Sequence, residues 1–259
     1  MRRVVAITGA SAGIGRATAV RLARDGAALA ICARRAEALA SAAEEIQRAG
    51  GEAVAVSADV TREADMVALV AAAVDRFGRL DAMVCNAGFG IYGPIDQIEP
   101  ARMQQLLDVN YMGTYLAARA ALPVFRRQQQ GHLIIVSSIV GKRGVPFMAA
   151  YAATKFAQVG FAESLRAELR GSGIHVTIVY PISTRTEFFD VMTRVSGSAT
   201  RAAGPQQDAS AVADAIARAI DSPVAEVFPF RIARLLGIVN AMAPQFTDRL
   251  VQRWGRKPI

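Results

Sequence analysis

The chain has 259 residues, a formal net charge of +8, two cysteines and two histidines. An α/β fold of this length commonly forms one domain with a large core, and no linker or repeat interrupts the pattern, so we predict a single domain over residues 1–259. The arginines are dispersed and few aromatic residues lie between them, which argues against nucleic-acid binding. The two cysteines lie in apolar stretches and the histidines are isolated, so neither a disulfide nor a metal site is indicated.

The first residues pass directly into a predicted strand, which leaves no room for the charged and apolar regions of a secretory signal. No apolar run reaches the ~18 to 20 residues that a membrane span requires. We therefore expect a cytoplasmic protein. The positive charge is compatible with several anionic partners, namely cofactor phosphates, an acidic lipid surface or an acidic carrier protein.

Short β-branched runs alternate with Ala-rich amphipathic stretches along the whole chain. The predicted strands, in chain order, are Val4–Thr8, Ala28–Ala33, Ala53–Ala58, Ala82–Asn86, Leu133–Ser137, Val176–Tyr180 and Glu226–Phe228. They are apolar without clean alternation, which is typical of a parallel sheet covered by helices on both faces. The pattern predicts a doubly wound, Rossmann-type α/β fold with about seven strands, whose ligands bind at the carboxyl ends of the strands.

A glycine-rich turn from Thr8 to Gly15 follows the first predicted strand and leads into a helical pattern. Small residues let the backbone approach a pyrophosphate, and the N-terminus of a helix favours its negative charge. The spacing G-x-x-x-G-x-G differs from the common dinucleotide fingerprint, and a tight structural turn can give the same pattern. We predict that this turn binds the cofactor phosphates through Gly9, Ser11, Gly13, Ile14 and Gly15.

The second predicted strand ends in Ala33-Arg34-Arg35 and carries no acidic residue there. Folds of this kind that use NAD place an acid against the ribose 2′-hydroxyl, whereas those that use NADP need a cation. A guanidinium can hold a 2′-phosphate with two hydrogen bonds. We therefore predict NADP(H) as cofactor and Arg34 as its main phosphate contact, with Arg35 either a second contact or the start of a solvated helix.

Polar motifs follow the later strands: Asp59-Val60, Asn86-Ala87-Gly88, Asn110, Ser138 and Tyr151-x-x-x-Lys155. A Tyr-x-x-x-Lys pair alone is a common chance pattern that places two side chains on one helix face. The order of these motifs, however, resembles that of the short-chain dehydrogenase/reductase family from Val4 to about Thr186. The resemblance implies that Asp59 contacts adenine and that Asn86-Ala87-Gly88 supports the central sheet.

The resemblance also implies catalytic roles for Asn110, Ser138, Tyr151 and Lys155. Tyr151 would donate and accept the proton, Ser138 would bind the substrate oxygen, and Asn110 would anchor a water that relays protons. Lys155 would hold the nicotinamide ribose, and its charge one helical turn from Tyr151 can lower the tyrosine pKa from near ~10.

The segment after the sixth predicted strand departs from the family pattern. Pro181, Thr184 and Thr186 match positions that contact the nicotinamide carboxamide. Ile182, however, stands where the family usually has glycine, which leaves the backbone geometry open.

These features predict an NADP(H)-dependent oxidoreductase that interconverts a carbonyl and a secondary alcohol. An apolar substrate is expected from the apolar residues near the motifs, although several can equally be core: Phe89, Ile91, Tyr92, Val145, Phe147, Met148, Phe188, Phe189 and Met192. Two alternatives stay open. One is a cofactor-binding regulatory protein without turnover. The other is a 3-oxoacyl-carrier-protein reductase, which the charge favours and the long Arg-rich C-terminal segment argues against.

Two segments outside the motifs complete the predictions. Residues 187–210 carry aromatics and then Ser, Gly and Ala with little periodicity, so we expect a substrate lid whose part from about 196 to 210 is a mobile loop. Residues 230–255 predict two amphipathic helices interrupted at Pro244 and flanked by arginines. We expect a homodimer or homotetramer in which this segment borders the substrate entrance. Weak peripheral contact with anionic lipid is the alternative.

Overall fold

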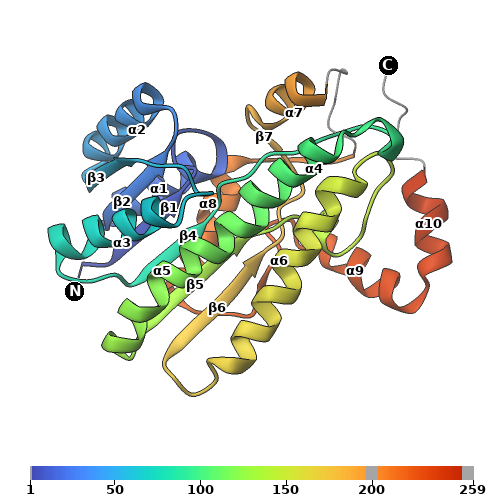
Figure 1. The fold of residues 1–259 in the computed structure, drawn as a ribbon. Helices are drawn as coiled ribbons and strands as arrows, with labels where there is room; N and C mark the ends of the chain where they lie inside the picture. Colours follow the sequence, from blue (N-terminus) through green and yellow to red (C-terminus); the bar gives the residue numbers. More distant parts are fainter. Residues whose placement is uncertain (1, 197–203, 253–259) are drawn as a thin grey trace.

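The computed structural model describes residues 2–196 and 204–252. Its central layer is a seven-stranded, fully parallel sheet with the order β3-β2-β1-β4-β5-β6-β9 (Figure 1). The strands are β1 (Val4–Thr8), β2 (Ala28–Ala33), β3 (Glu52–Ser57), β4 (Ala82–Cys85), β5 (Gly131–Val136), β6 (Ile174–Val179) and β9 (Glu226–Val227). The predicted fold class is confirmed, and the strand ends differ from the prediction by at most two residues.

Helices cover both faces of this sheet. One face carries α1 (Gly13–Arg24), α2 (Ala36–Arg48) and α8 (Ala209–Asp221), and the other carries α3 (Glu63–Phe77), α5 (Gly113–Gln128) and α6 (Ala149–Glu168). Successive side chains of a strand point to opposite faces. In β2, Ala30 and Cys32 therefore pack in one core while Leu29 and Ile31 pack in the other. Burial on both sides explains why the strands lack an alternating pattern.

The helices α4 (Pro100–Leu107) and α5 are joined by a π turn, η2 (Asp108–Met112). The Gly113 N–H donates to the Asp108 carbonyl five residues earlier, so the turn contains one residue more than a regular α-helical turn. Gly113 sits here because a Cβ would lie 2.7 Å from Val60 Cγ2. The turn places Asn110, which has no exposed surface, beneath the carboxyl edge of the sheet.

Part of the predicted lid has regular structure. The short strands β7 (Ser183–Arg185) and β8 (Gln206–Asp208) pair with each other, and α7 (Phe188–Ser196) follows β7. The prediction of a loop up to residue 210 is therefore wrong at its end, where β8 and the first residues of α8 lie. Strands of three residues are too short to give a periodic sequence pattern. Residues 197–203 of the predicted loop lie outside the described residues.

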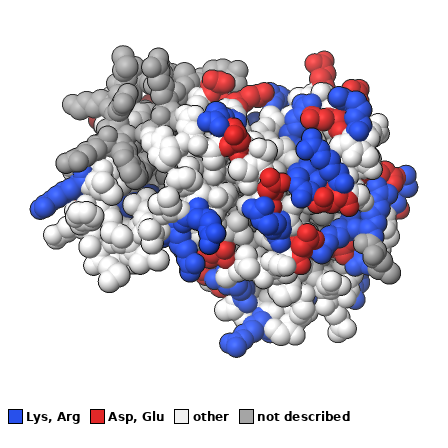
Figure 2. Space-filling model, turned by 180° about the vertical axis from the view of Figure 1, so that it is seen from behind, with Lys and Arg blue, Asp and Glu red and all other residues white. Residues whose placement is uncertain are grey.

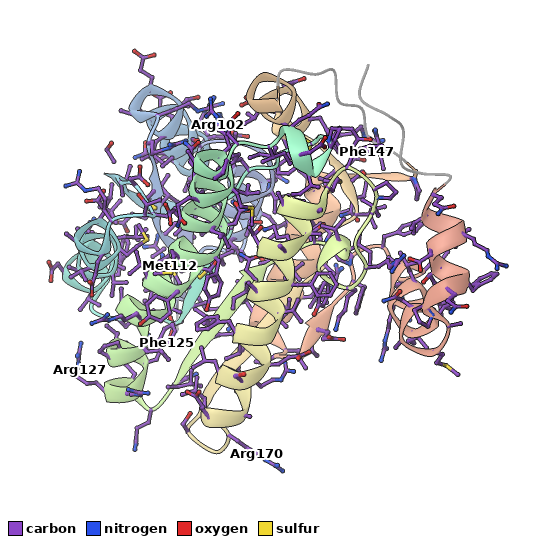
Figure 3. All side chains as sticks on the ribbon, turned by 45° about the vertical axis from the view of Figure 1, so that its right-hand side comes forward. Arg102, Met112, Phe125, Arg127, Phe147 and Arg170 are labelled. Atoms are coloured by element: carbon purple, nitrogen blue, oxygen red, sulfur yellow. The ribbon has the colours of Figure 1, made fainter. Side chains whose placement is uncertain are left out.

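The C-terminal segment forms two helices separated at Pro244, as predicted: α9 (Ala233–Met242) and α10 (Pro244–Gln252). They lie together at one side of the molecule (Figures 1 and 3). An ion pair between Arg143 and Asp248 and a hydrogen bond from Asn240 Nδ2 to the Lys142 carbonyl attach them to the segment after β5. The last predicted residues of this segment, from 253 on, lie outside the described part of the chain.

Several apolar side chains of this segment stay exposed, above all Met242 at 82% and Phe246 at 60%. From behind, charges of both signs are interspersed over one part of the surface, while the side that carries α9 and α10 is mostly uncharged (Figure 2). Among the described helices, none combines the length and the apolar character needed to cross a membrane.

Candidate active site

A cleft of about 1320 Å³ opens at the carboxyl ends of the strands. The loops after β1, β2, β4, β5 and β6 line it, as expected for ligand sites in sheets of this type. The cleft lies at one end of the molecule (Figure 3). Phe147, next to the cleft lining, is at this end, and Arg127 and Arg170 are at the opposite end. One half of the cleft is bordered by the glycine turn and the other by apolar side chains.

The glycine turn is held in a conformation that suits a phosphate group. Gly9 has φ +67°, and a Cβ there would lie 2.8 Å from the Ala87 Cα. A Cβ on Gly15 would lie 2.4 Å from the Gly9 carbonyl oxygen. The Asn86 Nδ2 donates to the carbonyl oxygens of Thr8, at 3.0 Å, and Gly9, at 3.2 Å. Because no side chain caps the N-terminus of α1, its N–H groups remain free for an anionic ligand.

Most of the predicted contacts in this half line the cleft, namely Gly9, Ser11, Gly13, Ile14, Arg34, Arg35, Asp59, Val60, Asn86, Ala87 and Gly88. Gly15 does not line it and instead permits close packing of α1 against the turn. The two arginines differ. Arg35 pairs with Glu187 at 3.2 Å, whereas Arg34 makes no ion pair with any described residue. Arg34 is therefore the freer cation.

Asp59 is kept ionised at the edge of the cleft. Burial acts to raise the pKa of Asp59, but hydrogen bonds from the Thr61 N–H and hydroxyl, at 3.0 and 2.9 Å, and the charge of Arg34 lower the pKa overall. The carboxylate thus stays an acceptor, which is the form that an adenine amino group requires.

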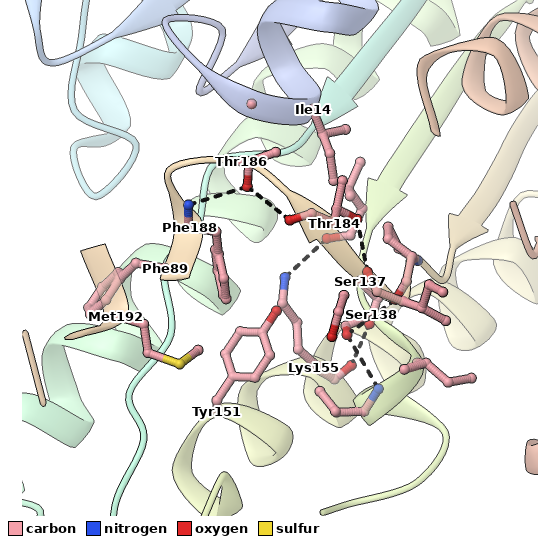
Figure 4. A pocket seen from close by; sticks show the side chains of 18 of the residues that line it. Ile14, Phe89, Ser137, Ser138, Tyr151, Lys155, Thr184, Thr186, Phe188 and Met192 are labelled. Carbon is pink, nitrogen blue, oxygen red and sulfur yellow. Dashed lines mark hydrogen bonds between the residues drawn. The ribbon is translucent and has the colours of Figure 1, made fainter. Parts of the chain in front are cut away.

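Tyr151 and Lys155 extend from α6 into the cleft beside Ser138, which follows β5 (Figure 4). Tyr151 is 6% exposed and its ring lies 5.6 Å from the ring of Phe188. The Lys155 Nζ donates to the Val136 carbonyl at 3.1 Å and lies 5.6 Å from the centre of the Tyr151 ring. The Ser138 hydroxyl accepts a hydrogen bond from the Val140 N–H at 3.3 Å. The structure therefore brings three of the four predicted catalytic residues together.

Burial dominates the ionisation of both α6 residues. It raises the pKa of Tyr151, and a hydrogen bond with Ser138 opposes this effect. It also lowers the pKa of Lys155 to about 7. The expected lowering of the tyrosine pKa by Lys155 is thus not seen, because loss of hydration on burial has the largest effect and only the hydrogen bond with Ser138 opposes it.

Asn110 lies below the cleft rather than in its lining. Its side chain binds the Phe89 N–H and carbonyl and the Thr154 hydroxyl, each at 3.0 Å. Its own carbonyl accepts from Thr114 Oγ1 and from Gln158 Nε2, both at 2.8 Å. These contacts make Asn110 a support for the loop after β4. Its predicted water-anchoring role stays a prediction.

The backbone at Ile182 does not require glycine. Only Gln129 and Phe147 combine a side chain with positive φ among the described residues, so Ile182 adopts a conformation open to any residue. Its carbonyl accepts from Thr184 Oγ1 at 2.8 Å. The predicted carboxamide contacts Pro181, Thr184 and Thr186 all line the cleft.

The other half of the cleft is apolar. Seven of the predicted pocket residues line it: Phe89, Tyr92, Val145, Met148, Phe188, Phe189 and Met192. The other two do not: Ile91 is buried in the same hydrophobic cluster as Leu106 and Val140, and Phe147 lies outside the lining. The C-terminal segment adds a wall that includes Ile232, Leu235, Leu236, Val239, Phe246 and Leu250.

Sequence reasoning missed two polar residues of this region. Gln158 accepts a hydrogen bond from the Lys155 Nζ at 3.0 Å, and Arg143 lines the cleft while its guanidinium pairs with Asp248 on α10. The signal for Gln158 was its spacing, because a polar residue three positions after a catalytic lysine shares its helix face. Arg143 gave no such signal.

The fold and this cleft together define a dinucleotide-binding oxidoreductase of the Rossmann type. Comparison with known proteins narrows the class: residues 3–195 match the family model of the short chain dehydrogenases. The chain belongs to this family.

Three similar proteins illustrate the range of the family. An uncharacterized oxidoreductase of Listeria innocua is 38% identical over 193 residues, which is 74% of this chain and 78% of that protein. The alcohol dehydrogenase of Thermococcus sibiricus, solved with 5-hydroxy-NADP, is 26% identical over 88% of this chain and 96% of its own, with a TM-score of 0.78. The 3-ketoacyl-(acyl-carrier-protein) reductase of Brucella melitensis, solved with NADH, is 30% identical over 87% of this chain and 96% of its own, with a TM-score of 0.78.

Proposed function

We propose that the protein is an NADP(H)-dependent oxidoreductase that interconverts a carbonyl and a secondary alcohol on an apolar substrate, with Tyr151 as general acid and base. One observation carries the proposal. Tyr151, Ser138 and Lys155 converge at the junction between a glycine turn suited to phosphate and an apolar half-cleft. A carbonyl held at this junction has a proton donor beside it and apolar walls for the rest of the molecule.

The residues of the polar half fit a dinucleotide phosphate. The turn at Gly9 leaves no room for a side chain, and the N-terminus of α1 is uncapped. Arg34, which has no described ion-pair partner, lies where a 2′-phosphate would need a cation, and Ala33 offers no carboxylate to repel it. These features support NADP(H) over NAD(H), although similar proteins have been solved with either kind.

The chain's own groups carry the proton chemistry. When bound, the nicotinamide supplies a hydride to the carbonyl carbon. The Tyr151 hydroxyl gives its proton to the carbonyl oxygen as negative charge develops there, and Ser138 donates a hydrogen bond to the same oxygen. The Lys155 ammonium stabilises the phenolate that is left. A proton from solvent restores the tyrosine, so each reduction consumes one proton.

The apolar half of the cleft supports an apolar substrate. The Phe188 ring lies tilted against the Tyr151 ring, and the C-terminal helices extend the apolar wall away from the reacting atoms. Aliphatic and aromatic lining of this extent favours ligands that bury hydrocarbon. Longer apolar ketones or aldehydes should therefore react with a higher kcat/KM than short polar ones.

A panel of ketones and aldehydes of graded size, assayed with NADPH by absorbance, tests this proposal. Turnover that rises with the length of the apolar chain is expected. Tight cofactor binding with no turnover of any member would instead indicate a regulatory protein that keeps the fold without catalysis. Preference for carrier-linked 3-oxoacyl substrates over free ones would indicate the acyl reductase, which the likeness to the Brucella melitensis enzyme supports.

We further propose that the protein acts as a cytoplasmic homo-oligomer. The exposed side chains of α9 that do not line the cleft, such as Ile238 and Met242, support burial against a second copy, since most amphipathic helices bury their apolar face on protein. In this arrangement the segment still borders the substrate entrance, because other side chains of the same helices line the cleft.

A further inference from the structure

Gln158 lies at the centre of the polar contacts beneath the catalytic residues, and the mechanism above does not use it. Its side chain has no exposed surface. Its Nε2 donates to the Asn110 carbonyl and to Thr114 Oγ1, both at 2.8 Å, while its Oε1 accepts from the Lys155 Nζ at 3.0 Å. A single buried amide therefore joins the π turn of η2 to the lysine.

The orientation of this amide is fixed by its partners. The Asn110 carbonyl can only accept a hydrogen bond, and a charged Lys155 can only donate one. The hydroxyl proton of Thr114 is donated to the Asn110 carbonyl at 2.8 Å, so Thr114 Oγ1 can only accept from Gln158. The amide nitrogen must face Asn110 and Thr114, and the oxygen must face Lys155.

The ammonium of Lys155 has three N–H groups. The Val136 carbonyl receives one of them at 3.1 Å, and Gln158 Oε1 receives the second. Fixing two directions of a tetrahedral group sets the third. We propose that Gln158 is a positioning residue that holds Lys155 in its charged form and aims the remaining N–H into the cleft. This proposal rests on the proposed function, because it concerns the lysine of that site.

The surroundings of Lys155 show why the amide oxygen matters. Its side chain is 4% exposed, and a buried cation needs acceptors to keep its charge. The described groups near Nζ are the Val136 carbonyl on β5, Gly88 after β4, and Tyr151 and Gln158 on α6. None of them is a carboxylate, and no charged neighbour contributes to the shift of the Lys155 pKa. Burial already lowers the pKa of Lys155 to about 7. Loss of one of two acceptors would leave the amine neutral at physiological pH.

The sequence makes a direct measurement practical. The chain has only three lysines, Lys142, Lys155 and Lys257. Protein labelled with 13C at the lysine ε-carbon gives three resonances, and Lys142→Arg and Lys257→Arg assign the third. Titration of the Lys155 signal then reports its pKa without any substrate or cofactor.

Gln158→Met removes the acceptor while keeping the length of the side chain. We expect it to lower the Lys155 pKa by about one to two units, the effect of one hydrogen bond to a charged group. The alkaline limb of the pH profile of kcat/KM for reduction should move to lower pH by the same amount. Gln158→Glu also loses the donor to the Asn110 carbonyl, but its ionised carboxylate places a negative charge beside the ammonium, so it should raise the Lys155 pKa.

Gln128→Met is the matched control. The Gln128 amide accepts from the Leu80 N–H at 3.0 Å and donates to the Leu80 carbonyl at 2.6 Å, next to Arg127 at the end of the molecule opposite the cleft. This variant should lose stability and keep the Lys155 pKa. The proposal is overturned if both Gln158 variants leave the Lys155 pKa unchanged, or if Gln128→Met shifts it equally. Absence of turnover in every protein would count against the proposed function alone, since the titration needs no activity.

Discussion

At the scale of single residues, the proposed chemistry depends on the hydroxyl of Tyr151. Tyr151→Phe keeps the ring contact with Phe188 and removes only the proton donor. We expect kcat to fall by ~10² to 10⁴-fold, the usual contribution of a general acid, while NADPH affinity stays nearly unchanged. Steady-state kinetics and fluorescence titration of the cofactor measure the two effects. Activity above about a tenth of that of the unmodified protein would contradict the role.

Cofactor preference is a second residue-scale property, and it centres on Arg34. Arg34→Ala should raise the Kd for NADPH roughly ten- to hundred-fold, the loss expected for a hydrogen bond between charged groups. It should leave the Kd for NADH almost unchanged. Ala33→Asp should weaken NADPH binding further, because its carboxylate would repel the 2′-phosphate. Equal kcat/KM with both cofactors in the unmodified protein would show that the cation is not used in this way.

Protonation of Lys155 predicts the pH dependence of reduction. Because its pKa is lowered to about 7, the lysine is charged below that pH and becomes neutral as the pH rises through it. Reduction also consumes a proton. The value of kcat/KM should therefore be highest on the acid side of about pH 7 and decline above it. A profile that is flat from about pH 6 to about pH 9 would show that this lysine does not titrate in the working range.

At the scale of elements, α7 is the part of the cleft that we expect to move. Phe188 reaches Tyr151, and a Cβ on Gly90 would lie 2.2 Å from the Met192 methyl, so α7 sits directly over the loop after β4. We predict that α7 is a lid, and that its amides exchange quickly in the free protein and slowly with NADPH and substrate bound. Hydrogen exchange followed by mass spectrometry gives the comparison. Uniformly slow exchange of α7 without ligands would exclude an opening lid.

Some elements and site residues could be predicted from the sequence, and others could not. Strands such as β1 and β2 follow from apolar runs that helices cover on both sides. Tyr151 and Lys155 follow from the order of motifs that resembles the family, because their spacing alone is a common chance pattern. The pairing of β7 with β8 joins two three-residue segments that have no period of their own. The contact of Gln158 with the Asn110 carbonyl depends on the π turn, and no periodic pattern records the one extra residue in that turn.

At the scale of the whole molecule, the state of assembly depends on where α9 and α10 bury their exposed side chains. We predict a dimer or tetramer in light scattering and no pelleting with anionic vesicles at physiological salt. The reason is that a second copy covers an apolar face more completely than a lipid headgroup layer does. Truncation after Pro229 should reduce the size of the assembly. A monomer that pellets with vesicles, and is released by the truncation, would show that lipid is the partner.

The order of strands also determines when the fold can be completed. β1 leaves the ribosome well before its neighbour β4, which begins only at Ala82, and β6 receives β9 only after Glu226 has been made. Every pairing in the central sheet is parallel and so depends on contacts between distant parts of the chain, which slows folding. During synthesis, the edges of apolar strands stay unpaired until their partner strands have been made, and meanwhile they can associate with strand edges of other chains. Slow translation at low temperature, or a chaperone that shields these edges, should therefore raise the yield of native protein.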